Sequence, residues 1–334
     1  MTPALIILIV LAIVFDFLNG LHDSSNIVAT MISSRAFRPQ TALAFTAVAH
    51  FFGPFLFGVA VAKTIGSEVV QAESITLEVI IAALFGAIIW NLLTWFFGIP
   101  SSSSHALIGG IIGAVAIGAG FDVIKLNGLE KVLIALLASP IVGFVLGFLI
   151  TRLIFFLARA ATPKINTFFK RSQIVTALVL AFSHGTNDAQ KTMGIITLGL
   201  LISGFIPDFR VPVWVIAVSA GAIALGTAFG GWRLIRTLGG KFYKIRPVDS
   251  FASQLTSGIV ILGASLFGGP VSTTQVVSSA IIGVGSSERF SKVRWNVAEE
   301  IITAWIITIP ATALLSAGTY WVLVNIPAIQ NFLR

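Results

Sequence analysis

Cysteine is absent from this chain of 334 residues. The absence excludes disulfide bonds, thiolate metal sites and catalysis by a thiol. Charged residues are scarce as well: they make up 10% of the chain, whereas an ordinary soluble domain carries about 25%. No Lys or Arg precedes Arg35, so the apolar N-terminal stretch lacks the basic segment that begins a secretory signal peptide. We therefore expect this stretch to remain in the protein as a membrane span.

Hydrophobic residues make up 56% of the chain, and its mean hydropathy is +0.98. The 31 Gly and 12 Pro are residues that transmembrane bundles use for close packing and interrupted helices. We predict an all-α, multi-pass protein of the cell (plasma or inner) membrane, surrounded by the lipid bilayer and without a nucleic-acid partner. Because a spanning helix needs about 20 apolar residues, we expect about ten passes. They fall at residues 3–34, 41–62, 76–98, 102–120, 129–158, 172–202, 211–238, 250–268, 271–286 and 295–326.

Two polar motifs occur twice in this apolar chain. The motif at residues 19–26 recurs loosely at 184–191, and the motif at 100–105 recurs at 270–275. The spacing from Asp23 to Asp188 is nearly the same as the spacing from Pro100 to Pro270, so both pairs fit one duplication. The duplication divides the chain into a first repeat at 1–160, a short basic connector at 161–171 and a second repeat at 172–334.

Each repeat contains five apolar stretches, an odd number, so the second repeat should be inverted relative to the first. Basic clusters at 35–38, 152–171, 233–246 and 289–294 would all lie in the cytoplasm by the positive-inside rule, with both termini outside. We expect helix breaks near 19–26 and 184–191. The Ser-rich motifs lie either at the ends of hairpins that span the membrane or in re-entrant hairpins. Inverted repeats with interrupted helices are typical of secondary transporters, which hold substrate near the midplane.

The Ser- and Thr-rich motifs each follow a proline and precede an apolar helix. This order predicts a helix N-terminus, where capping hydroxyls, free backbone N–H groups and the helix dipole favour an oxyanion. The alternative is that these hydroxyls only satisfy backbone carbonyls and help helices to pack. The predicted anion ligands are Ser101, Ser102, Ser103, Ser104, Ser272, Thr273 and Thr274.

The Asp-containing motifs gather hard oxygen ligands in hydrophobic segments, where an ionisable residue is costly and usually functional. Carboxylate and amide oxygens suit a small hard cation. The predicted cation ligands are Asp23, Asn19, Asn187 and Asp188, and the two carboxylates are the metal ligands if the coupling ion is Na⁺. A protonatable Asp in a proton-coupled carrier and a purely structural Asp are the alternatives.

Neighbouring polar residues fit several roles. Asp16 precedes Asp23 by about two helical turns and is a candidate relay or ligand. His22 and His184 either orient an Asp or serve as hydrogen-bonded structural residues. Lys191 either balances Asp188, touches the anion or has a structural role.

Taken together, the four motifs resemble those of the inorganic phosphate transporter family, and the similarity extends over essentially the whole chain. The resemblance implies a cation-coupled phosphate symporter. It assigns coupling cations to Asp23, Asn26, Asn187 and Asp188, and phosphate to the hydroxyls at 102–104 and 272–274. The chain departs from the family pattern at His22 and at Gln275, which bears on the coupling ion more than on the fold.

We therefore expect a secondary transporter that imports inorganic phosphate together with Na⁺ or H⁺, without a cofactor, and with a homodimer as one assembly to consider. Asn26 and Gln190 are also assigned to the phosphate site. A sulfate permease of the same fold is the main alternative, followed by a passive anion channel. An intramembrane hydrolase using Ser104 and His105 is disfavoured, because adjacent residues of a helix point apart and no nucleophile or zinc motif occurs.

Overall fold

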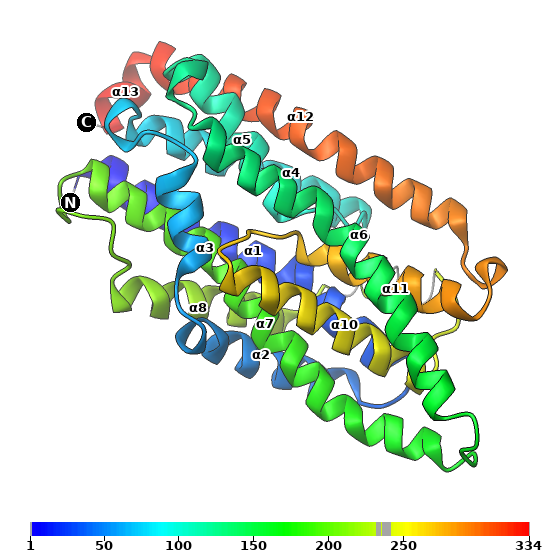
Figure 1. Ribbon diagram of the computed structural model, residues 1–334. Helices are drawn as coiled ribbons and strands as arrows, with labels where there is room; N and C mark the ends of the chain where they lie inside the picture. The colour runs from blue at the N-terminus through cyan, green and yellow to red at the C-terminus, as the bar shows by residue number, and fades with distance from the viewer. Residues whose placement is uncertain (1, 232–234, 236–241, 334) are drawn as a thin grey trace.

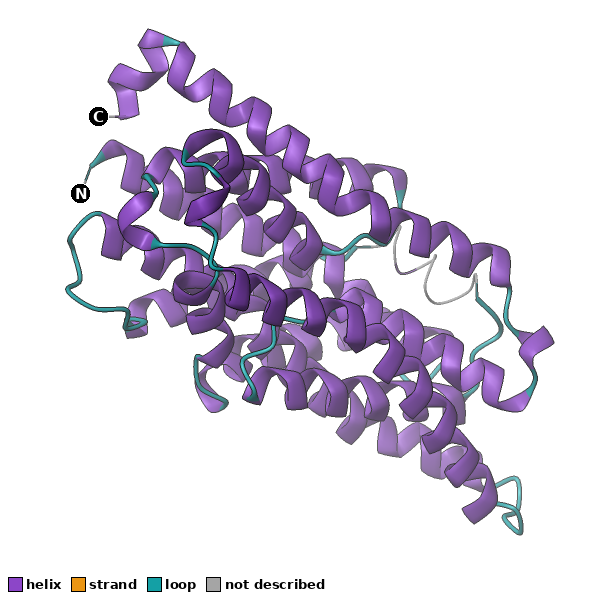
Figure 2. Ribbon diagram, turned by 45° about the horizontal axis from the view of Figure 1, so that its top comes forward, coloured by secondary structure: helices purple, strands orange, loops and turns teal. Residues whose placement is uncertain are grey.

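The protein is a bundle of helices (Figure 1). The structure, a computed structural model, describes residues 2–231, 235 and 242–333. In those residues the only β-pairing is an isolated bridge between Val70 and Ile124, and Figure 2 draws the described chain as helices and loops. Arg233, Arg236 and Lys241 of one basic cluster lie outside the described residues. The helices are α1 Pro3–Ser33, α2 Pro39–Leu56, α3 Ala60–Lys63, α4 Leu77–Phe97, α5 Ser103–Gly118, α6 Leu126–Leu157, α7 Ile165–Ile202, α8 Val213–Phe229, α10 Pro247–Leu266, α11 Thr273–Glu288, α12 Trp295–Asn325 and α13 Pro327–Leu333.

Several of these helices are long enough to span a membrane. Within the described part of the chain, four helices, α1, α4, α6 and α12, are long and apolar enough to cross a bilayer. The pair Pro39–Leu56 and Ala60–Glu68, bent by 71°, adds a fifth, and α5 and α8 are apolar but shorter. Each expected span coincides with a helix or with this bent pair, the span at 211–238 through α8, while residues 232–234 and 236–238 of that span lie outside the described residues. The all-helical membrane fold is confirmed, while the number of passes stays a prediction.

The expected breaks within the Asp motifs are wrong, because α1 and α7 run through them as continuous helices. Short hydroxyl side chains in the motifs bond back to their own helix: Ser24 Oγ donates to the Leu21 carbonyl at 2.9 Å, and Thr186 Oγ1 donates to the Phe182 carbonyl at 2.7 Å. Such bonds satisfy the hydroxyls locally and leave the helical backbone intact. The motif side chains therefore project from rigid helices.

The glycine of each Asp motif permits two helix backbones to cross closely. A Cβ added to Gly20 of α1 would lie 2.2 Å from the Ile223 carbonyl oxygen of α8, and one added to Gly185 of α7 would lie 2.7 Å from His50 Cα of α2. Small residues at such crossings let packing supply the association energy in a membrane. The two crossings hold the Asp-bearing helices against fixed neighbours.

We expect Gly226→Ala to destabilise the protein, because a Cβ there would lie 1.9 Å from the Phe17 carbonyl oxygen of α1. Overpacking of this kind costs about 1–3 kcal/mol. Gly221→Ala on the same helix is the matched control: its Cβ would meet nothing within 4 Å, and Ala exceeds Gly in helix propensity by up to about 1 kcal/mol. Thermal unfolding in detergent should show a lower Tm for the first variant alone; equal Tm values would refute the close crossing.

The two halves of the chain are interlaced. Helix α6 packs against α10 and α11, whereas α12 packs against α4 and α5. Helix α1 likewise contacts α8, and α7 contacts α2. Both termini lie at one end of the bundle, and the connector between α6 and α7 lies at the other (Figure 1). This arrangement brings the polar motifs of both halves together in the interior.

Candidate functional site

Two helix N-termini abut inside the bundle. Ser102 caps α5 by accepting the His105 amide at 3.1 Å, and Ser272 caps α11 by accepting the Gln275 amide at 3.3 Å. The expected helix starts are thus confirmed. Ser104 Oγ donates to the Val271 carbonyl at 2.9 Å and joins the two ends. The other first-turn amides have no partner within their own helices, so they remain available to an anion.

Asp23, which is buried on α1, accepts hydrogen bonds from the second of these N-termini. Its Oδ1 accepts from Thr274 Oγ1 at 2.8 Å and from Asn26 Nδ2 at 3.0 Å. Its Oδ2 lies 3.2 Å from Thr273 Oγ1. Asn26 Nδ2 also lies 3.0 Å from Thr274 Oγ1. The first Asp motif and the second Thr motif therefore form one cluster, although they lie in opposite halves of the chain.

Asp188 on α7 completes the cluster from the other half. Its Oδ2 lies 3.0 Å from the same Thr273 Oγ1, and its Oδ1 contacts the Lys191 ammonium. Lys191 Nζ also donates to Ser104 Oγ at 2.6 Å and to the Val271 carbonyl at 3.2 Å. Because a hydroxyl carries a single proton, Thr273 can donate to only one carboxylate at a time. The two acidic groups therefore compete for one donor.

Imidazole rings also contact the two carboxylates. His184 Nδ1 lies 3.1 Å from Asp188 Oδ2, and its Nε2 lies 3.9 Å from Asp23 Oδ2. His22 Nδ1 lies 3.4 Å from Asp23 Oδ1. Ligand atoms of Asp23, His184 and Asp188 all lie within 4.8 Å of one another. This group could hold a cation between α1 and α7.

His50 also belongs to the surroundings of the site, although it lies outside the repeated motifs. Its ring stacks on His184 with the centroids 5.0 Å apart. His50 Nδ1 also lies 2.8 Å from Thr227 Oγ1 of α8. The contact follows from the close crossing of α2 and α7 at Gly185. Only the fold could reveal it, because no sequence signal links His50 to the motifs.

Other predicted ligands are engaged away from the two carboxylates. Ser101 Oγ donates to Thr94 Oγ1 at 2.9 Å. Asn187 Nδ2 donates to Ser265 Oγ at 2.8 Å and to the Gly269 carbonyl at 3.2 Å. Gln190 Oε1 accepts the Val61 and Ala62 amides at the start of α3, at 2.8 and 3.2 Å. These three side chains support the loops and helix ends around the cluster.

Several buried oxygen atoms near the cluster have no hydrogen-bond partner. They include both carboxylate oxygens of Asp16 and the amide oxygens of Asn19, Asn26 and Asn187. Asn19, Asp23 and Asn26 share one face of α1, since residues four and three apart are neighbours on a helix. Burying an unpaired polar atom costs about 1–3 kcal/mol. The first half therefore presents unused acceptor oxygens beside a carboxylate, as a cation site requires.

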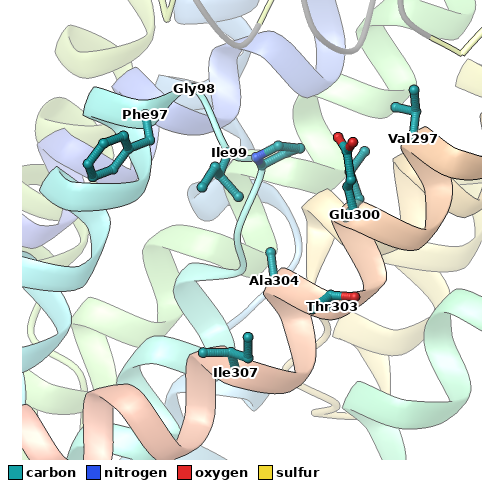
Figure 3. A pocket seen from close by; sticks show the side chains of 10 residues that line it. Phe97, Gly98, Ile99, Val297, Glu300, Thr303, Ala304 and Ile307 are labelled. Carbon is teal, nitrogen blue, oxygen red and sulfur yellow. The ribbon is translucent and has the colours of Figure 1, made fainter.

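Two cavities open near the first turns of α5 and α11. One of about 580 Å³ reaches His105 and Gln275 and is otherwise lined mainly by apolar side chains of α6 and α12. Another, of about 450 Å³, lies between the loop at Gly98–Pro100 and the start of α12. Figure 3 shows Glu300, Ala304 and Ile307 on the α12 side of this pocket, opposite Ile99. The second cavity therefore adjoins the segment that leads into α5, and the first adjoins α5 itself.

The pairing required for a hydrolase does not form between Ser104 and His105. Ser104 Oγ contacts Lys191 and the Val271 carbonyl, whereas His105 Nδ1 lies 2.8 Å from Ser102 Oγ. No proton could pass directly from this hydroxyl to this imidazole. The two side chains diverge as expected for neighbours on a helix.

Apolar helices that enclose carboxylates, hydroxyls and an ammonium define an integral membrane protein with a central polar site, the architecture of a transporter. Residues 19–316 match the model of the phosphate transporter family. The chain belongs to this family, whose members are transporters and not enzymes.

Several known proteins are similar to this chain over nearly its whole length. A protein of Rhizobium meliloti (strain 1021) named "Probable low-affinity inorganic phosphate transporter" is 46% identical over 321 residues, covering 96% of each chain. A Bacillus subtilis (strain 168) protein of the same name is 46% identical over 326 residues, covering 95% of this chain and 96% of its own. A solved structure entitled "The sodium-dependent phosphate transporter" superposes with a TM-score of 0.88 at 24% identity, covering 97% of this chain and 99% of its own. This last likeness supports the fold.

Proposed function

We propose that the protein imports inorganic phosphate across the cell membrane in symport with Na⁺ or H⁺. In this proposal, residues 1–160 and 172–334 are inverted repeats, and 161–171 is their cytoplasmic connector. The observation that carries the proposal is the position of Thr273, whose hydroxyl lies 3.2 Å from Asp23 Oδ2 and 3.0 Å from Asp188 Oδ2. One helix N-terminus thereby meets the carboxylates of both halves.

The chemistry of the cluster matches phosphate. Helix N-termini and hydroxyls donate hydrogen bonds to phosphate oxygens. Near neutral pH phosphate also carries at least one proton, which it can donate to a carboxylate. Ser104, Thr273 and Thr274 supply the hydroxyls, and Asp23 and Asp188 supply the acceptors. Of the four predicted serines in the first motif, Ser104 is the one that contacts Lys191.

The coupling cation offsets buried negative charge. A cation beside Asp23 would find the unpaired amide oxygens of Asn19 and Asn26 on the same helix face. Binding the cation and phosphate together lowers the cost of desolvating either charge alone. In this proposal both ions must therefore be bound before the site closes to one side of the membrane and opens to the other.

Phosphate can enter only if the hydroxyls release the carboxylates. In this structure Thr273 and Thr274 bond to the Asp residues directly. We propose that the N-termini of α5 and α11 move away from α1 and α7 and then turn their amides and hydroxyls to the anion. The glycine crossings of α1 with α8 and α7 with α2 would stay closed.

Uptake of radiolabelled phosphate into proteoliposomes tests the proposed function. Na⁺ and pH gradients should be imposed separately, so that the gradient that drives accumulation identifies the coupling cation. Accumulation above the external concentration is expected with one of them. Equilibration without accumulation under both gradients would instead indicate a passive channel.

Thr273→Val should lower phosphate uptake about 10- to 150-fold, because it removes a hydrogen bond to a charged group worth about 1.5–3 kcal/mol. Thr273→Ser keeps the hydroxyl and should retain most uptake. Thr319→Val is the matched control, since Thr319 Oγ1 bonds only to the Leu315 carbonyl of its own helix, at 2.8 Å. Initial rates at equal protein content provide the measurement, and a Thr273→Val rate equal to that of the control would remove Thr273 from the site.

A further inference from the structure

The duplication places Lys191 in the position that Asn26 has in the first half, because each follows the Asp of its motif at the same spacing. Asn26 Nδ2 donates to Asp23 Oδ1 at 3.0 Å and lies 3.0 Å from Thr274 Oγ1. Lys191 Nζ donates to Asp188 Oδ1 and, at 2.6 Å, to Ser104 Oγ. Ser104 and Thr274 hold the same place in their own repeated motifs. The two sets of contacts therefore correspond group by group.

The two halves nevertheless differ in what they offer a cation. In the first half, Asp23 is accompanied by the amides of Asn19 and Asn26, whose oxygens have no hydrogen-bond partner. In the second half, the position of Asn19 is held by His184, and the position of Asn26 is held by the Lys191 ammonium. An ammonium has three donors and no acceptor, so it cannot ligate a cation. It repels one instead.

We infer that the Lys191 ammonium permanently occupies the second cation position, so the protein has one site for a transported Na⁺, built around Asn19, Asp23 and Asn26. Lys191 is fully enclosed, with 1% of its surface exposed. Its three contacts, to Asp188, Ser104 and the Val271 carbonyl, use the three donors of the ammonium. Asp188 is thus paired with an ammonium, whereas the contacts of Asp23 are to hydroxyls, an amide and imidazole rings.

This inference rests on the proposed function for the statement that the cation is transported. The inference can be tested at position 191, because Lys191→Asn introduces the residue type that the first half has at the matching position, Asn26. An Asn at 191 would place an amide beside Asp188, as Asn26 lies beside Asp23, while His184 Nδ1, 3.1 Å from Asp188 Oδ2, stands in the position of Asn19. Lys191→Met is the matched control, since it removes the charge at similar length without supplying a hard oxygen ligand.

Equilibrium binding of ²²Na⁺ to the purified full chain in detergent with saturating phosphate counts the sites. We expect one Na⁺ per chain in the wild type and in Lys191→Met, two in Lys191→Asn, and none in Asn26→Lys. A wild-type count of zero or two overturns the inference, and so does a Lys191→Asn count that fails to rise by one. Size-exclusion profiles establish that each variant is folded.

The shift of Tm on adding Na⁺ is a second measurement, and it detects bound Na⁺ even in a variant whose stability is lowered. Added Na⁺ should raise the Tm of Lys191→Asn by a larger amount than that of the wild type, because two bound ions stabilise more than one. Added Na⁺ should leave the Tm of Asn26→Lys unchanged. Phosphate uptake by the wild type is measured separately: its absence would end the proposed function, while the sodium counts would still decide the role of Lys191.

Discussion

Asp188→Asn is expected to reduce gradient-driven phosphate uptake to the level of protein-free liposomes and to destabilise the fold. The amide nearly matches the carboxylate in volume but lacks its charge, so the buried Lys191 ammonium would lose its counter-ion. Breaking a buried ion pair from one side costs about 3–5 kcal/mol. Asp23→Asn should abolish uptake with a smaller loss of stability, because Asp23 lies among neutral donors and imidazoles.

The double variant Asp188→Asn with Lys191→Met separates folding from transport. Replacing both charges removes the unpaired ammonium, and such replacements are often neutral for stability. The double variant should therefore regain the Tm lost by Asp188→Asn while uptake stays absent. Near-normal uptake by Asp23→Asn and Asp188→Asn would contradict the assignment of these carboxylates to the transport site.

A tenfold excess of sulfate should inhibit phosphate uptake far less than a tenfold excess of arsenate does. Sulfate has no proton to donate near neutral pH, so at a site lined by Asp23 and Asp188 an oxygen would face an acceptor. An unsatisfied buried group of this kind costs about 1–3 kcal/mol, or roughly 5- to 150-fold in affinity. Arsenate carries protons in the same tetrahedral geometry as phosphate.

Competition assays with labelled phosphate at a fixed pH measure this selectivity. Sulfate and arsenate are added as free anions with choline as the counter-ion, so that the Na⁺ gradient does not change. If sulfate displaced phosphate as effectively as arsenate does, no acidic acceptor would contact the anion, and the sulfate permease would become the better description.

The sequence was sufficient to predict the helical membrane fold and the N-termini of α5 and α11. Ser102 and Ser272 cap helices as the Pro-Ser pattern predicted, because capping depends on residues within one turn. The continuity of α1 and α7 was missed because hydroxyl bonds such as Ser24 to the Leu21 carbonyl can stabilise a polar segment inside a helix. Local composition does not distinguish that outcome from a break.

The candidate site was predicted as two kinds of motif, but their contacts depend on the tertiary packing. Thr273 reaches both Asp23 and Asp188 because α11 lies against helices from opposite halves, a relation that no spacing encodes. Gln190, predicted as a phosphate ligand, instead accepts the first amides of α3. The nearest sequence signal for the role of Lys191 was its alignment with Asn26 across the duplication.

Because α6 packs against α10 and α11, and α12 packs against α4 and α5, the first half of the chain cannot complete its packing before the second half is made. Helix α5 leaves the ribosome early, yet its partner α12 is among the last segments to be synthesised. Helix α6 must likewise wait for α10 and α11. Until α11 has been made, Asp23 lacks the Thr273 and Thr274 hydroxyls that donate to it in the finished protein. The first half alone therefore leaves Asp23 without two of its hydrogen-bond donors.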